Sequence, residues 1–589
     1  MAEIKLTPEQ IAKLKEVAKA QRANLEKLAS ETKQKAEEYV CTVFCCNSTS
    51  CRSAGGESVL DAFQSAVETN SLADKVRVVK TGCMGLCSAG PLVRVEIKGQ
   101  KPVMYKKLDA MTARLVVVEH IEKALREGND FKLSPTLAEH TLSLDSAFFK
   151  KQEKVVLRDM GSYDPESIEQ YVSHGGYSAF KKVLDTMTPE EVVAEILKSG
   201  LRGRGGAGFP TGKKWEFSLK EDVGEGGEKF FICNGDEGDP GAYMDSCTSE
   251  GDPHAVLEGM LIGAYATKAT TGWFYIRAEY PLAVKRIENA IRQAKKFGLL
   301  GKNILGSDFN FNVELRLGAG AFVCGEETAL MASLEGKRGS PRPRPPYPVK
   351  SGLFGKSSCI NNVETLANIP KIIDKGGDWF ASMGTEKSKG TKVFALTGHI
   401  KNGGLVEVPM GTTIREIVES IGGGTDSGKA LKAVQTGGPS GGLIPKDMLD
   451  LKVCYDALRE VGSIMGSGGM IVLDESDSIV DVATFYLGFT VDESCGKCAP
   501  CRIGGYQMLQ LLKKVAAGKG TMQDIEKIKQ IAHTMQKASL CGLGQTAPNP
   551  ILSSLKFFMN EYEERLLPAT KTPAATAAAA STSTEAKEK

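Results

Sequence analysis

The sequence predicts an α/β protein of several domains. Its 589 residues are enough for roughly three to five domains of ordinary size. Hydrophobic residues make up 41% and charged residues 25% of the chain, a globular composition that can bury a core. Short β-branched runs alternate with segments of helical period over most of the chain, which favours α/β domains.

The charge balance and the hydropathy pattern exclude several classes of protein. The 74 Lys and Arg residues against 72 Asp and Glu leave a net charge of +2, which disfavours a nucleic-acid-binding protein. No apolar run reaches the roughly 18–20 residues of a membrane-spanning helix, and the N-terminus lacks the apolar segment of a signal peptide. Fifteen cysteines, several of them clustered, therefore indicate a cytoplasmic protein whose thiolates bind metal.

The N-terminal part is expected to begin with a helix and to continue as a small domain. Residues 1–35 are rich in Lys and Glu, and a Thr-Pro-Glu-Gln capping box at residues 7–10 precedes apolar residues at helical spacing. This pattern fits a solvated helix with one apolar stripe, or a helix that docks on a partner subunit. Residues 36–127 are interpreted as a small α/β domain, and residues 128–160, which show no strong period, as a linker.

The rest of the chain divides into a large domain, a small β-rich domain and a helical domain. Residues 161–390 alternate glycine-rich loops, strands and helices and are interpreted as one large α/β domain. Residues 391–480 hold short strands and turns, and residues 481–566 have a helical pattern of Leu and Ile. The final residues, 567–589, are rich in Ala, Thr and Ser without aromatics and are expected to be disordered.

The first group of cysteines lies in the small N-terminal domain. Cys46 and Cys51 are spaced C-x4-C, and Cys83 and Cys87 are spaced C-x3-C, each pair after a predicted strand. Four thiolates on two neighbouring loops can hold a 2Fe–2S cluster, and small residues in both loops let backbone N–H groups approach it. A structural zinc site and disulfides are the alternatives, although zinc pairs more often have C-x2-C spacing. Cys45 could replace Cys46 as the first ligand, but we prefer Cys46.

The second group of cysteines lies in the helical domain. Cys495, Cys498 and Cys501 form a C-x2-C-x2-C run, a spacing that lets three thiolates bind three irons of a 4Fe–4S cluster. Cys541 lies at the end of the next helical segment, so that a helical hairpin can return it as the fourth ligand. A zinc site is the alternative.

A glycine-rich loop stands in the large domain. Gly203, Gly205, Gly206 and Gly208 form a G-x-G-x-x-G pattern, but it follows a predicted helix and not the strand that a Rossmann fingerprint requires. The loop still lets a phosphate or a flat ring approach backbone N–H groups, although the pattern alone also fits an ordinary turn. The side chains that follow can pair with phosphates or stack on rings, and they include Lys214, Phe209 and Phe217.

Three further loops of the large domain combine acids, amides and glycines. The residues are Asn234, Asp236, Glu237 and Asp239 in the first loop, Gly325, Glu326 and Glu327 in the second, and Asn361, Asn362 and Thr365 in the third. Each loop alone could be a metal loop, a helix cap or a surface turn. Together they offer the groups that a site for a nucleotide-derived cofactor needs.

The motifs together resemble a known family. They follow the order found in the NADH-oxidising flavoprotein of respiratory complex I and in its relatives, the beta subunits of NAD-dependent hydrogenases and formate dehydrogenases. The resemblance spans about residues 36–565 and rests on the motifs at 203–212, 234–241, 324–328, 361–365 and 495–501. The N-terminal cysteine domain resembles a domain that is a separate subunit in complex I. Its fusion here is most similar to the beta subunits of electron-bifurcating-type iron-only hydrogenases.

The resemblance implies a fold and a cofactor for each domain. The chain would contain a thioredoxin-like 2Fe–2S domain, a large α/β domain that binds FMN and NAD(H), a β-grasp (SLBB) domain and a C-terminal helical bundle with a 4Fe–4S cluster. FMN would contact Gly203, Gly205, Lys214, Asn234, Asp236, Gly325, Asn361 and Asn362, and the same motifs include Gly206, Gly208, Glu237, Asp239 and Thr365. Glu326 and Glu327 would lie near the nicotinamide as catalytic residues, and Phe209, Phe217 and Tyr347 near the adenine.

The resemblance also implies a function and partners. NADH would deliver a hydride to FMN, and the iron–sulfur clusters would pass single electrons to a hydrogenase-type catalytic iron–sulfur subunit, in a hetero-oligomer with a small 2Fe–2S subunit. The alternatives are a ferredoxin-coupled bifurcating hydrogenase, a transhydrogenase, a formate dehydrogenase complex or a non-catalytic relay subunit. No cysteine follows Cys541, where many hydrogenase beta subunits carry a ferredoxin domain. We therefore expect electron exchange without obligatory ferredoxin coupling.

Overall fold

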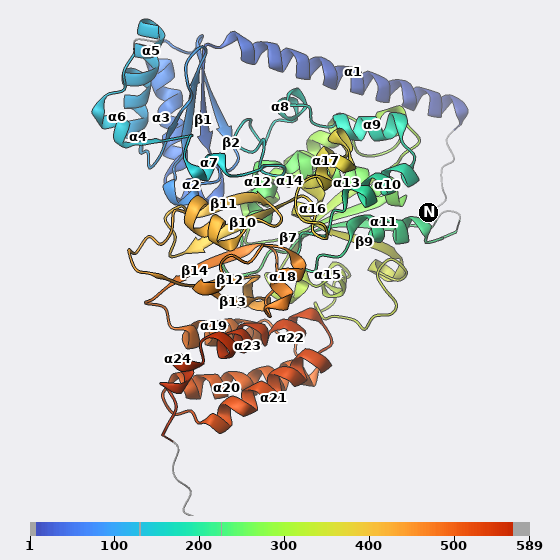
Figure 1. Ribbon diagram of the computed structural model, residues 1–589. Helices are drawn as coiled ribbons and strands as arrows, with labels where there is room; N and C mark the ends of the chain where they lie inside the picture. Colours follow the sequence, from blue (N-terminus) through green and yellow to red (C-terminus); the bar gives the residue numbers. More distant parts are fainter. Residues whose placement is uncertain (1–6, 129–130, 225–226, 569–589) are drawn as a thin grey trace, which may run out of the picture.

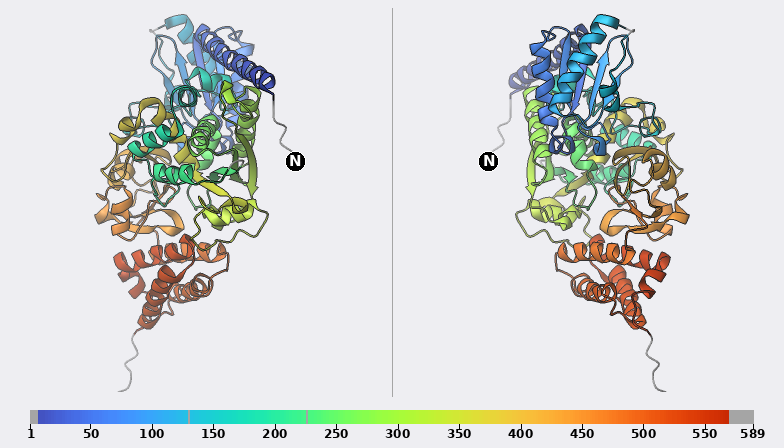
Figure 2. Two further views of the ribbon diagram at one scale, coloured as in Figure 1. Left: turned by 90° about the vertical axis from the view of Figure 1, so that its right-hand side faces the viewer. Right: turned by 90° about the vertical axis from the view of Figure 1, so that its left-hand side faces the viewer.

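The structure is a computed structural model that describes residues 7–128, 131–224 and 227–568. Three sheets and a helical bundle follow one another along the chain, and the N-terminal domain and the bundle lie at opposite ends of the molecule (Figures 1 and 2). Among the described residues, no helix is both long enough and apolar enough to span a bilayer. The disordered segment expected at 567–589 lies outside the described residues from 569 onward.

The N-terminal domain is built on a five-stranded sheet. Its strands are β1 (Cys41–Cys46), β2 (Val76–Thr81), β3 (Val93–Ile97), β4 (Val103–Tyr105) and β5 (Thr141–Leu142), in the order β2-β1-β3-β4-β5. Its helical elements are α2 (Thr49–Ser53), α3 (Gly56–Thr69), and the run of α4 (Ala110–Leu115), η2 (Val116–Glu122) and α5 (Lys123–Glu127). Apolar residues of α3 and of this run pack against one face of the sheet.

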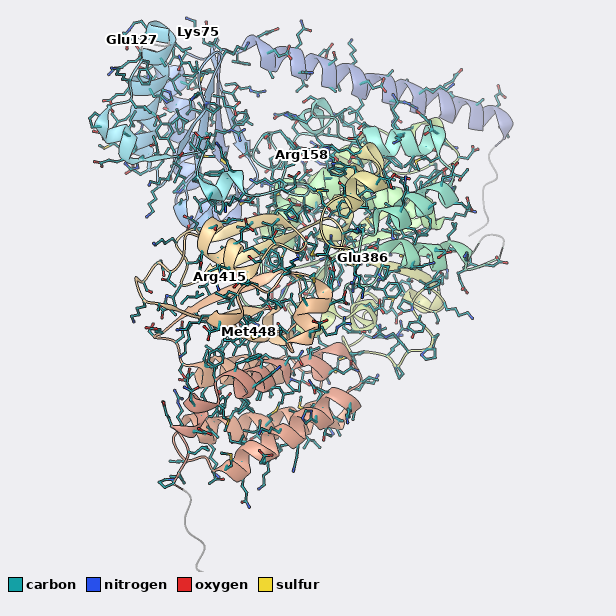
Figure 3. The ribbon with its side chains drawn as sticks, viewed as in Figure 1. Lys75, Glu127, Arg158, Glu386, Arg415 and Met448 are labelled. Carbon is teal, nitrogen blue, oxygen red and sulfur yellow. The ribbon has the colours of Figure 1, made fainter. Side chains whose placement is uncertain are left out.

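The segment expected to be a linker is more ordered than its sequence indicates. It contains α6 (Pro135–Glu139), α7 (Ala147–Lys150) and strand β5, which extends the first sheet by pairing with β4. These elements are only two to five residues long, too short to show a period in the sequence. After them, the stretch around Arg158 leads from the first sheet toward the large domain (Figure 3).

Helix α1 (Pro8–Glu38) bridges the first two domains, as Figure 1 shows. Arg22 forms two hydrogen bonds to the Asp185 carboxylate, at 3.1 and 2.7 Å. Leu25 is buried in the apolar core of the large domain, and Leu28 packs against the same core. Most described residues of the helix are exposed, as expected for a solvated helix with one apolar stripe, and over this stretch the stripe packs on the chain's own large domain.

The large domain contains a parallel sheet covered on both faces. Strands β6 (Lys229–Gly235), β7 (Thr271–Arg277), β8 (Asn312–Gly318) and β9 (Ser357–Asn362) are arranged in the order β8-β7-β6-β9. Phe231 and Phe274 face one apolar core, whereas Ile232 and Tyr275 face a second core with Leu330. Alternate residues of each strand are thus buried on opposite faces, which explains the continuous apolar runs in the sequence.

Helices surround this sheet. They are α8 (Ile168–Ser173), α9 (Ser178–Thr186), α10 (Pro189–Ser199), α11 (Thr211–Lys220), α12 (Met244–Gly251), α13 (Pro253–Thr267), α14 (Pro281–Lys296), α15 (Glu327–Leu334), α16 (Val363–Lys375) and α17 (Gly377–Ala381). Thr188 and Glu191 form a capping box at the start of α10, with Pro189 in the first turn.

The strand order of the large domain sets the place of a ligand site. The chain runs from β6 outward through β7 to β8, and then returns to β9 on the other side of β6. In such parallel sheets, ligands bind beyond the carboxyl ends of the two strands where the order reverses. Asn234, one residue before the end of β6, pairs with Asn362 at the end of β9, so two of the predicted amides meet at this point.

The last two domains are a third sheet and the helical bundle. The sheet has the order β11-β10-β14-β12-β13, with β10 (Thr391–Gly398), β11 (Gly404–Pro409), β12 (Leu431–Thr436), β13 (Gly442–Pro445) and β14 (Gly469–Asp474), and α18 (Tyr455–Glu460) beside it. Figure 3 labels Arg415 and Met448 in this domain. The bundle contains α19 (Ile479–Asp492), α20 (Gly505–Ala516), α21 (Met522–Ala538), α22 (Gly542–Thr546), α23 (Asn549–Phe557) and α24 (Met559–Glu563).

Candidate active site and metal centres

A large cleft opens at the carboxyl ends of β6 and β9. Its volume is about 1210 Å³, above the roughly 300–1,000 Å³ of a typical single-ligand pocket, so two adjacent ligands can fit. The predicted residues that line it are Gly203, Gly205, Gly208, Phe209, Lys214, Phe217, Asn234, Gly325, Glu326, Glu327, Tyr347, Asn361, Asn362 and Thr365. Loops far apart in the sequence therefore form one site.

The glycine-rich loop approaches its neighbours too closely for side chains at several positions. A Cβ on Gly205 would stand 2.9 Å from Cβ of Asn362, and one on Gly208 would meet the Tyr455 ring at 2.6 Å. Gly206 has φ +113° and forms an isolated β-bridge with Gly466, so it faces the third sheet and does not line the cleft. The loop thus exposes backbone on one side and packs tightly on the other.

Two cationic side chains and one carboxylate form an ion-pair group at the cleft. Lys214 Nζ donates to the Ile360 carbonyl at 2.9 Å and lies 3.9 Å from Glu327 Oε2. Arg344 Nη1 donates to Glu327 Oε1 at 2.6 Å. These two cations provide the charge that phosphates of a nucleotide cofactor would need.

Glu326, the other predicted glutamate, also has a partner within the fold. Glu326 Oε2 accepts hydrogen bonds from the Thr328 and Ala329 N–H groups and so caps the N-terminus of α15, although the residue still lines the cleft. The amides are also held in place: Asn362 accepts from Thr365 N at 3.2 Å, and Asn361 accepts from Trp215 Nε1 at 3.3 Å. The site residues are therefore fixed before any ligand binds.

The acidic loop after β6 lies largely behind the cleft. Asp236, Glu237 and Asp239 are absent from the cleft lining. Glu237 accepts from two backbone N–H groups at the start of α12, and Asp239 accepts from Ser467 Oγ at 2.6 Å. The three acids were predicted to belong to the cofactor site, but none lines the cleft, and two of them bind backbone or side-chain donors of the fold.

Asp236 keeps unsatisfied hydrogen-bonding capacity near the site. Burial raises the pKa of Asp236 to about 7, although Arg277 lies 3.6 Å away and opposes this rise. Its Oδ2 atom and Arg277 Nη1 are buried and lack hydrogen-bond partners within the described residues. The Asp236 carbonyl stands 3.4 Å from the place of a Cβ on Gly325, which lines the cleft. Such orphaned polar atoms beside a cleft fit a polar ligand such as FMN.

Three aromatic rings stand exposed around the cleft. Phe209, Phe217 and Tyr347 are 48%, 51% and 58% exposed, and all three line the cleft. Large exposed rings in a concave site are unusual for a soluble domain and typical of a surface on which a flat ligand stacks. They are the predicted adenine contacts.

The four cysteines of the helical domain converge. Cys495, Cys498, Cys501 and Cys541 all line one small cavity between the C-x2-C-x2-C run and α22. Burial raises the pKa of Cys541 to about 11, and the backbone N–H groups of Gly544 and Leu543 oppose this by hydrogen bonding to its sulfur. Four thiols with N–H donors aimed at one of them fit a 4Fe–4S cluster.

The four cysteines of the N-terminal domain also converge. Cys46 ends β1 and its thiol interacts with those of Cys51 and Cys83. Cys83 Sγ lies 3.7 Å from Cys87 Sγ and accepts a hydrogen bond from Gly85 N at 3.3 Å. Two loops thus bring four sulfur atoms together, as a 2Fe–2S cluster requires.

The structure bears on the choice between Cys45 and Cys46. Cys45 is buried with Cys41 and Val43 in the core between the sheet and its helices, whereas Cys46 packs with Cys51. Adjacent residues of a strand point to opposite faces, so only one of the two can join the cluster loops. This arrangement supports Cys46.

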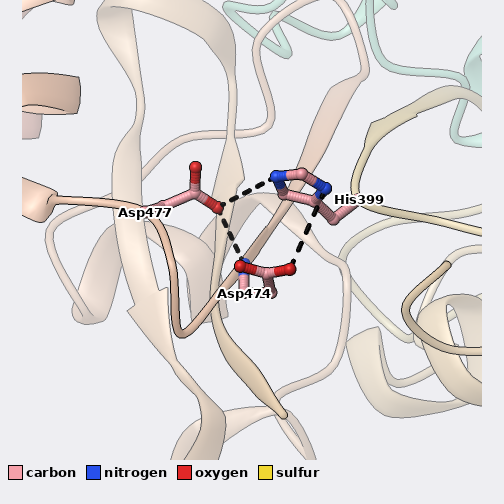
Figure 4. Close-up of side chains that lie close together, drawn as sticks. All are labelled: His399, Asp474 and Asp477. Atoms are coloured by element: carbon pink, nitrogen blue, oxygen red, sulfur yellow. Dashed lines mark hydrogen bonds and ion pairs between the residues drawn. The ribbon is translucent and has the colours of Figure 1, made fainter. Parts of the chain in front are cut away.

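A further group of possible metal ligands lies on the third sheet, where His399, Asp474 and Asp477 approach one another (Figure 4). Nδ1 of His399 faces Asp474 at 3.9 Å, while Nε2 faces Asp477 at 3.6 Å. The two ring nitrogens point to different carboxylates, so the three residues do not aim at one point. The side chains of Ser427 and Ser476 also donate to Asp474, and we interpret the group as an ion-pair network.

Sequence reasoning missed one feature of the cleft. Gly542, next to Cys541, lines it, so the cleft extends to the cavity of the second cysteine group. The prolines beside the predicted Tyr347, at 345, 346 and 348, also line it. No local spacing pairs Gly542 with the glycine-rich loop, because more than 300 residues separate them. Only the Cys541 assignment, through its neighbour, could have pointed there.

The fold and these sites define a flavin- and iron–sulfur-type electron-transfer protein. Sequence profiles match the domains in turn: a thioredoxin-like [2Fe-2S] ferredoxin at 9–116, a Nuo51 FMN-binding domain at 196–371, an SLBB domain at 393–443 and the NADH-ubiquinone oxidoreductase-F iron-sulfur binding region at 481–565. These matches bear out the predicted order of domain types.

Known proteins of similar sequence and structure agree with the profiles. The NADP-reducing hydrogenase subunit HndC of Solidesulfovibrio fructosivorans is 56% identical over 70% of this chain and 84% of its own length. An NADH-quinone oxidoreductase subunit of Aquifex aeolicus is 45% identical over 68% of this chain and 91% of its own length. A crystal structure of an NAD⁺-reducing [NiFe]-hydrogenase in its H₂-reduced state matches 90% of this chain and 85% of that chain, with TM-score 0.63 and 29% identity.

The chain belongs to the family of complex I 51-kDa-type flavoproteins, which includes these hydrogenase and NADH-quinone oxidoreductase subunits. It is an NADH dehydrogenase-type oxidoreductase with FMN, NAD(H), one 2Fe–2S cluster and one 4Fe–4S cluster as its cofactors. As the relatives' names state, such chains are subunits of larger enzymes. The predicted family, cofactors and type of enzyme are thereby confirmed.

Proposed function

We propose that this chain exchanges electrons between NAD(H) and a hydrogenase-type catalytic iron–sulfur subunit, in a hetero-oligomer that also contains a small 2Fe–2S subunit. Its similarity to HndC and to the NAD⁺-reducing hydrogenase structure supports this partner over a quinone-reducing complex. The single observation that carries the proposal is the cleft, which combines exposed rings, cations and a direct boundary with the Cys541 cavity. The fifteen free thiols fit a reducing compartment, and we infer a cytoplasmic location.

The inner part of the cleft would hold FMN. Gly203 and Gly205 offer backbone, Lys214 offers charge for the phosphate, and Asn361 and Asn362 offer amides at the end of β9. When bound, FMN supplies the conversion between the two-electron chemistry of a nicotinamide and the one-electron chemistry of iron–sulfur clusters. The residues of the chain contribute binding, orientation and charge.

The outer part of the cleft would hold the nicotinamide nucleotide. Phe209, Phe217 and Tyr347 would stack on its adenine, because their rings are exposed and line the same opening. Glu327, held between Lys214 and Arg344, would orient the nicotinamide end. We keep Glu326 with it as a site residue, since it lines the cleft while capping α15.

The partner would dock near the 4Fe–4S site. Cys501 lies in the turn at Pro500–Gly504, and two residues just beyond it, Ile503 and Tyr506, are 54% and 53% exposed. These positions, three apart on a helical surface, are neighbours and form an apolar spot. An electron acceptor seated there would stand beside the cysteine cavity, whereas a free domain would not need apolar residues at this place.

The test compares two exposed phenylalanines in the complex purified with its partner. Phe217→Ala should raise the KM for the nicotinamide nucleotide about 2- to 12-fold, the range of one aromatic stacking contact, with kcat little changed. Phe354→Ala is the matched control, because Phe354 is 55% exposed but lies outside the cleft. Equal kinetics for the two variants would contradict the placement of the nucleotide.

A second measurement concerns the partner and ferredoxin. Ile503→Asp should reduce co-purification of the catalytic subunit while anaerobic bleaching of the flavin by NADH persists. Turnover of the intact complex with NAD(H) and its terminal substrate should proceed without added ferredoxin. Strict dependence on ferredoxin would favour the bifurcating alternative.

A further inference from the structure

Helix α12 of the large domain lies between the cofactor cleft and the N-terminal cysteine loops. All eight of its residues are buried. In its first turn, Asp245 Oδ2 accepts from Asn362 Nδ2 at 2.5 Å, which ties the helix to the cleft. In its last turn, Glu250 accepts from the N–H and hydroxyl groups of Thr49, at 2.9 and 2.5 Å, just beyond Cys46. The helix is thus fixed at both ends.

The contact between α12 and the second cysteine loop is close enough to exclude solvent. A Cβ on Gly82 would stand 2.4 Å from the Gly251 Cα atom, so the backbones touch. The loop is held from its other side too, because Leu405 N of β11 donates to the Gly85 carbonyl at 2.8 Å. Cys83, Cys87 and Cys247 pack in the same apolar core. Polar groups in this contact must therefore pair with one another.

Two polar side chains, one in α12 and one just before it, pack with the two cysteines of this loop. Tyr243, the residue that precedes the helix, packs against the same core as Cys87, and its hydroxyl interacts with the Cys87 thiol. Cys247, one turn further, is buried in that core with Cys83, and the two thiols interact. Residues four apart share one face of a helix, so both groups come from the same face. Each predicted ligand of the loop thus has one facing donor.

In each of these pairs, chemistry decides whether the cluster cysteine or the side chain beside α12 donates the hydrogen bond. A thiolate bound to iron has no proton to give and can only accept, whereas a tyrosine hydroxyl and a thiol each carry a hydrogen. Hydrogen bonds to cluster sulfurs favour the more negative, reduced state and so raise the reduction potential. The structure therefore has the large domain supplying donors to a cluster that the N-terminal domain binds.

We propose that Tyr243 and Cys247 are positioning residues that donate hydrogen bonds to the Cys87 and Cys83 thiolates and thereby raise the reduction potential of the 2Fe–2S cluster. The proposal rests on Cys83 and Cys87 being ligands. The reduction potential of this cluster would then depend on the contact between the N-terminal domain and the large domain. A free N-terminal domain would lack both donors.

The experiment is a redox titration of the 2Fe–2S EPR signal in the purified complex. Loss of one hydrogen bond should lower the equilibrium constant for reduction about fivefold, which is about 40 mV for one electron. Tyr243→Phe and Cys247→Ala should each show this shift, and the double variant a larger one. Cys247→Ser keeps a donor and should restore most of the potential. The 4Fe–4S signal should not move.

A control variant and the cluster content distinguish the loss of a hydrogen bond to the cluster from the loss of a cluster ligand. Thr248→Ala is the control, because it removes a buried hydroxyl of the same helix that donates to the Met244 carbonyl, and the cluster potential of this variant should match that of the parent. Unchanged potentials in both Tyr243→Phe and Cys247→Ala, with full cluster content, would overturn the proposal. Loss of the cluster in Cys247→Ala alone would identify Cys247 as a ligand instead. A retained normal signal in Cys87→Ala would refute the ligand assignment itself.

Discussion

The tight contact at Gly205 gives the sharpest prediction about the cleft. Gly205 has no positive φ, so alanine is compatible with its backbone. The added Cβ would stand 2.9 Å from Cβ of Asn362, whereas carbon atoms pack best at about 3.5–4.0 Å. Asn362 must therefore give way by at least about 0.6 Å if the contact is to reach the lower end of that range.

Asn362 cannot move without losing its own contacts. Its Oδ1 accepts from Thr365 N at 3.2 Å and caps α16, and its Nδ2 donates to Asp245 at 2.5 Å. Overpacking of this kind costs about 1–3 kcal/mol. The protein without FMN can relieve the strain by letting Asn362 shift, but the complex needs Asn362 in the cleft. The strain therefore opposes binding, and the Kd for FMN should rise about 5- to 150-fold in Gly205→Ala.

The assay is a fluorescence titration of FMN into protein from which the flavin has been removed. Gly469→Ala is the control, because a Cβ there would meet only the Ala242 Cβ at 3.8 Å, an ordinary contact. Asn362→Gly removes the clashing atom and keeps a residue tolerated at N-caps. In that background Gly205→Ala should cost almost nothing. A Kd within twofold of the parent, or an equal loss in both backgrounds, would refute the reasoning.

Three further predictions concern the two cysteine sites and the buried ion pair between Lys392 of the third sheet and Glu364 of the large domain. Cys46→Ala should abolish the 2Fe–2S EPR signal and Cys45→Ala should retain it; the reverse result would make Cys45 the ligand. Cys495→Ser should perturb the 4Fe–4S signal and slow electron delivery to the partner while NADH still bleaches the flavin, and failure of bleaching in a folded variant would contradict this order. Lys392→Met should destabilise the protein by about 3–5 kcal/mol in thermal unfolding, because it leaves Glu364 buried without its cation, and adding Glu364→Gln should recover much of the loss.

The structure brings together the cysteines that the sequence grouped, because cysteine spacing has a direct physical meaning. A C-x2-C-x2-C run places three thiols close enough to bind one small cluster. The fourth ligand, Cys541, was predicted because a helical hairpin brings it back beside the run. The choice between Cys45 and Cys46 could not be made this way. Period-two alternation says that the two face opposite sides of a strand, but not which side is the core.

The acidic loop shows why side-chain roles are harder to predict than motifs. Asp236, Glu237 and Asp239 stand together in the sequence, yet the structure gives each a different partner: Arg277, the N-terminus of α12, and Ser467. Residue type and spacing describe what a group can do. They do not say whether the N–H groups of a neighbouring helix will bind a given carboxylate, because the position of α12 depends on tertiary packing.

The same limit applies to the two donors on α12. Nothing in the local sequence distinguishes Cys247 from the other buried cysteines outside the two ligand groups, such as Cys233 and Cys359. Its distinction is the place where its helix packs, against a domain that ends more than 100 residues earlier in the chain. Only the assembled structure brings Cys247 and Cys83 together.

The two cysteine sites also differ in how they relate to the cleft. Gly542 lines the cleft and adjoins Cys541, so the 4Fe–4S site is contiguous with the cofactor opening. No cysteine of the N-terminal group lines the cleft, and α12 stands between, joined to it through Asn362. A cluster held behind α12 would stand to one side of the cleft, whereas a cluster held at Cys541 would adjoin it. In the proposed complex, electrons would therefore leave toward the partner on the Cys541 side, and α12 would set how readily the 2Fe–2S cluster is reduced.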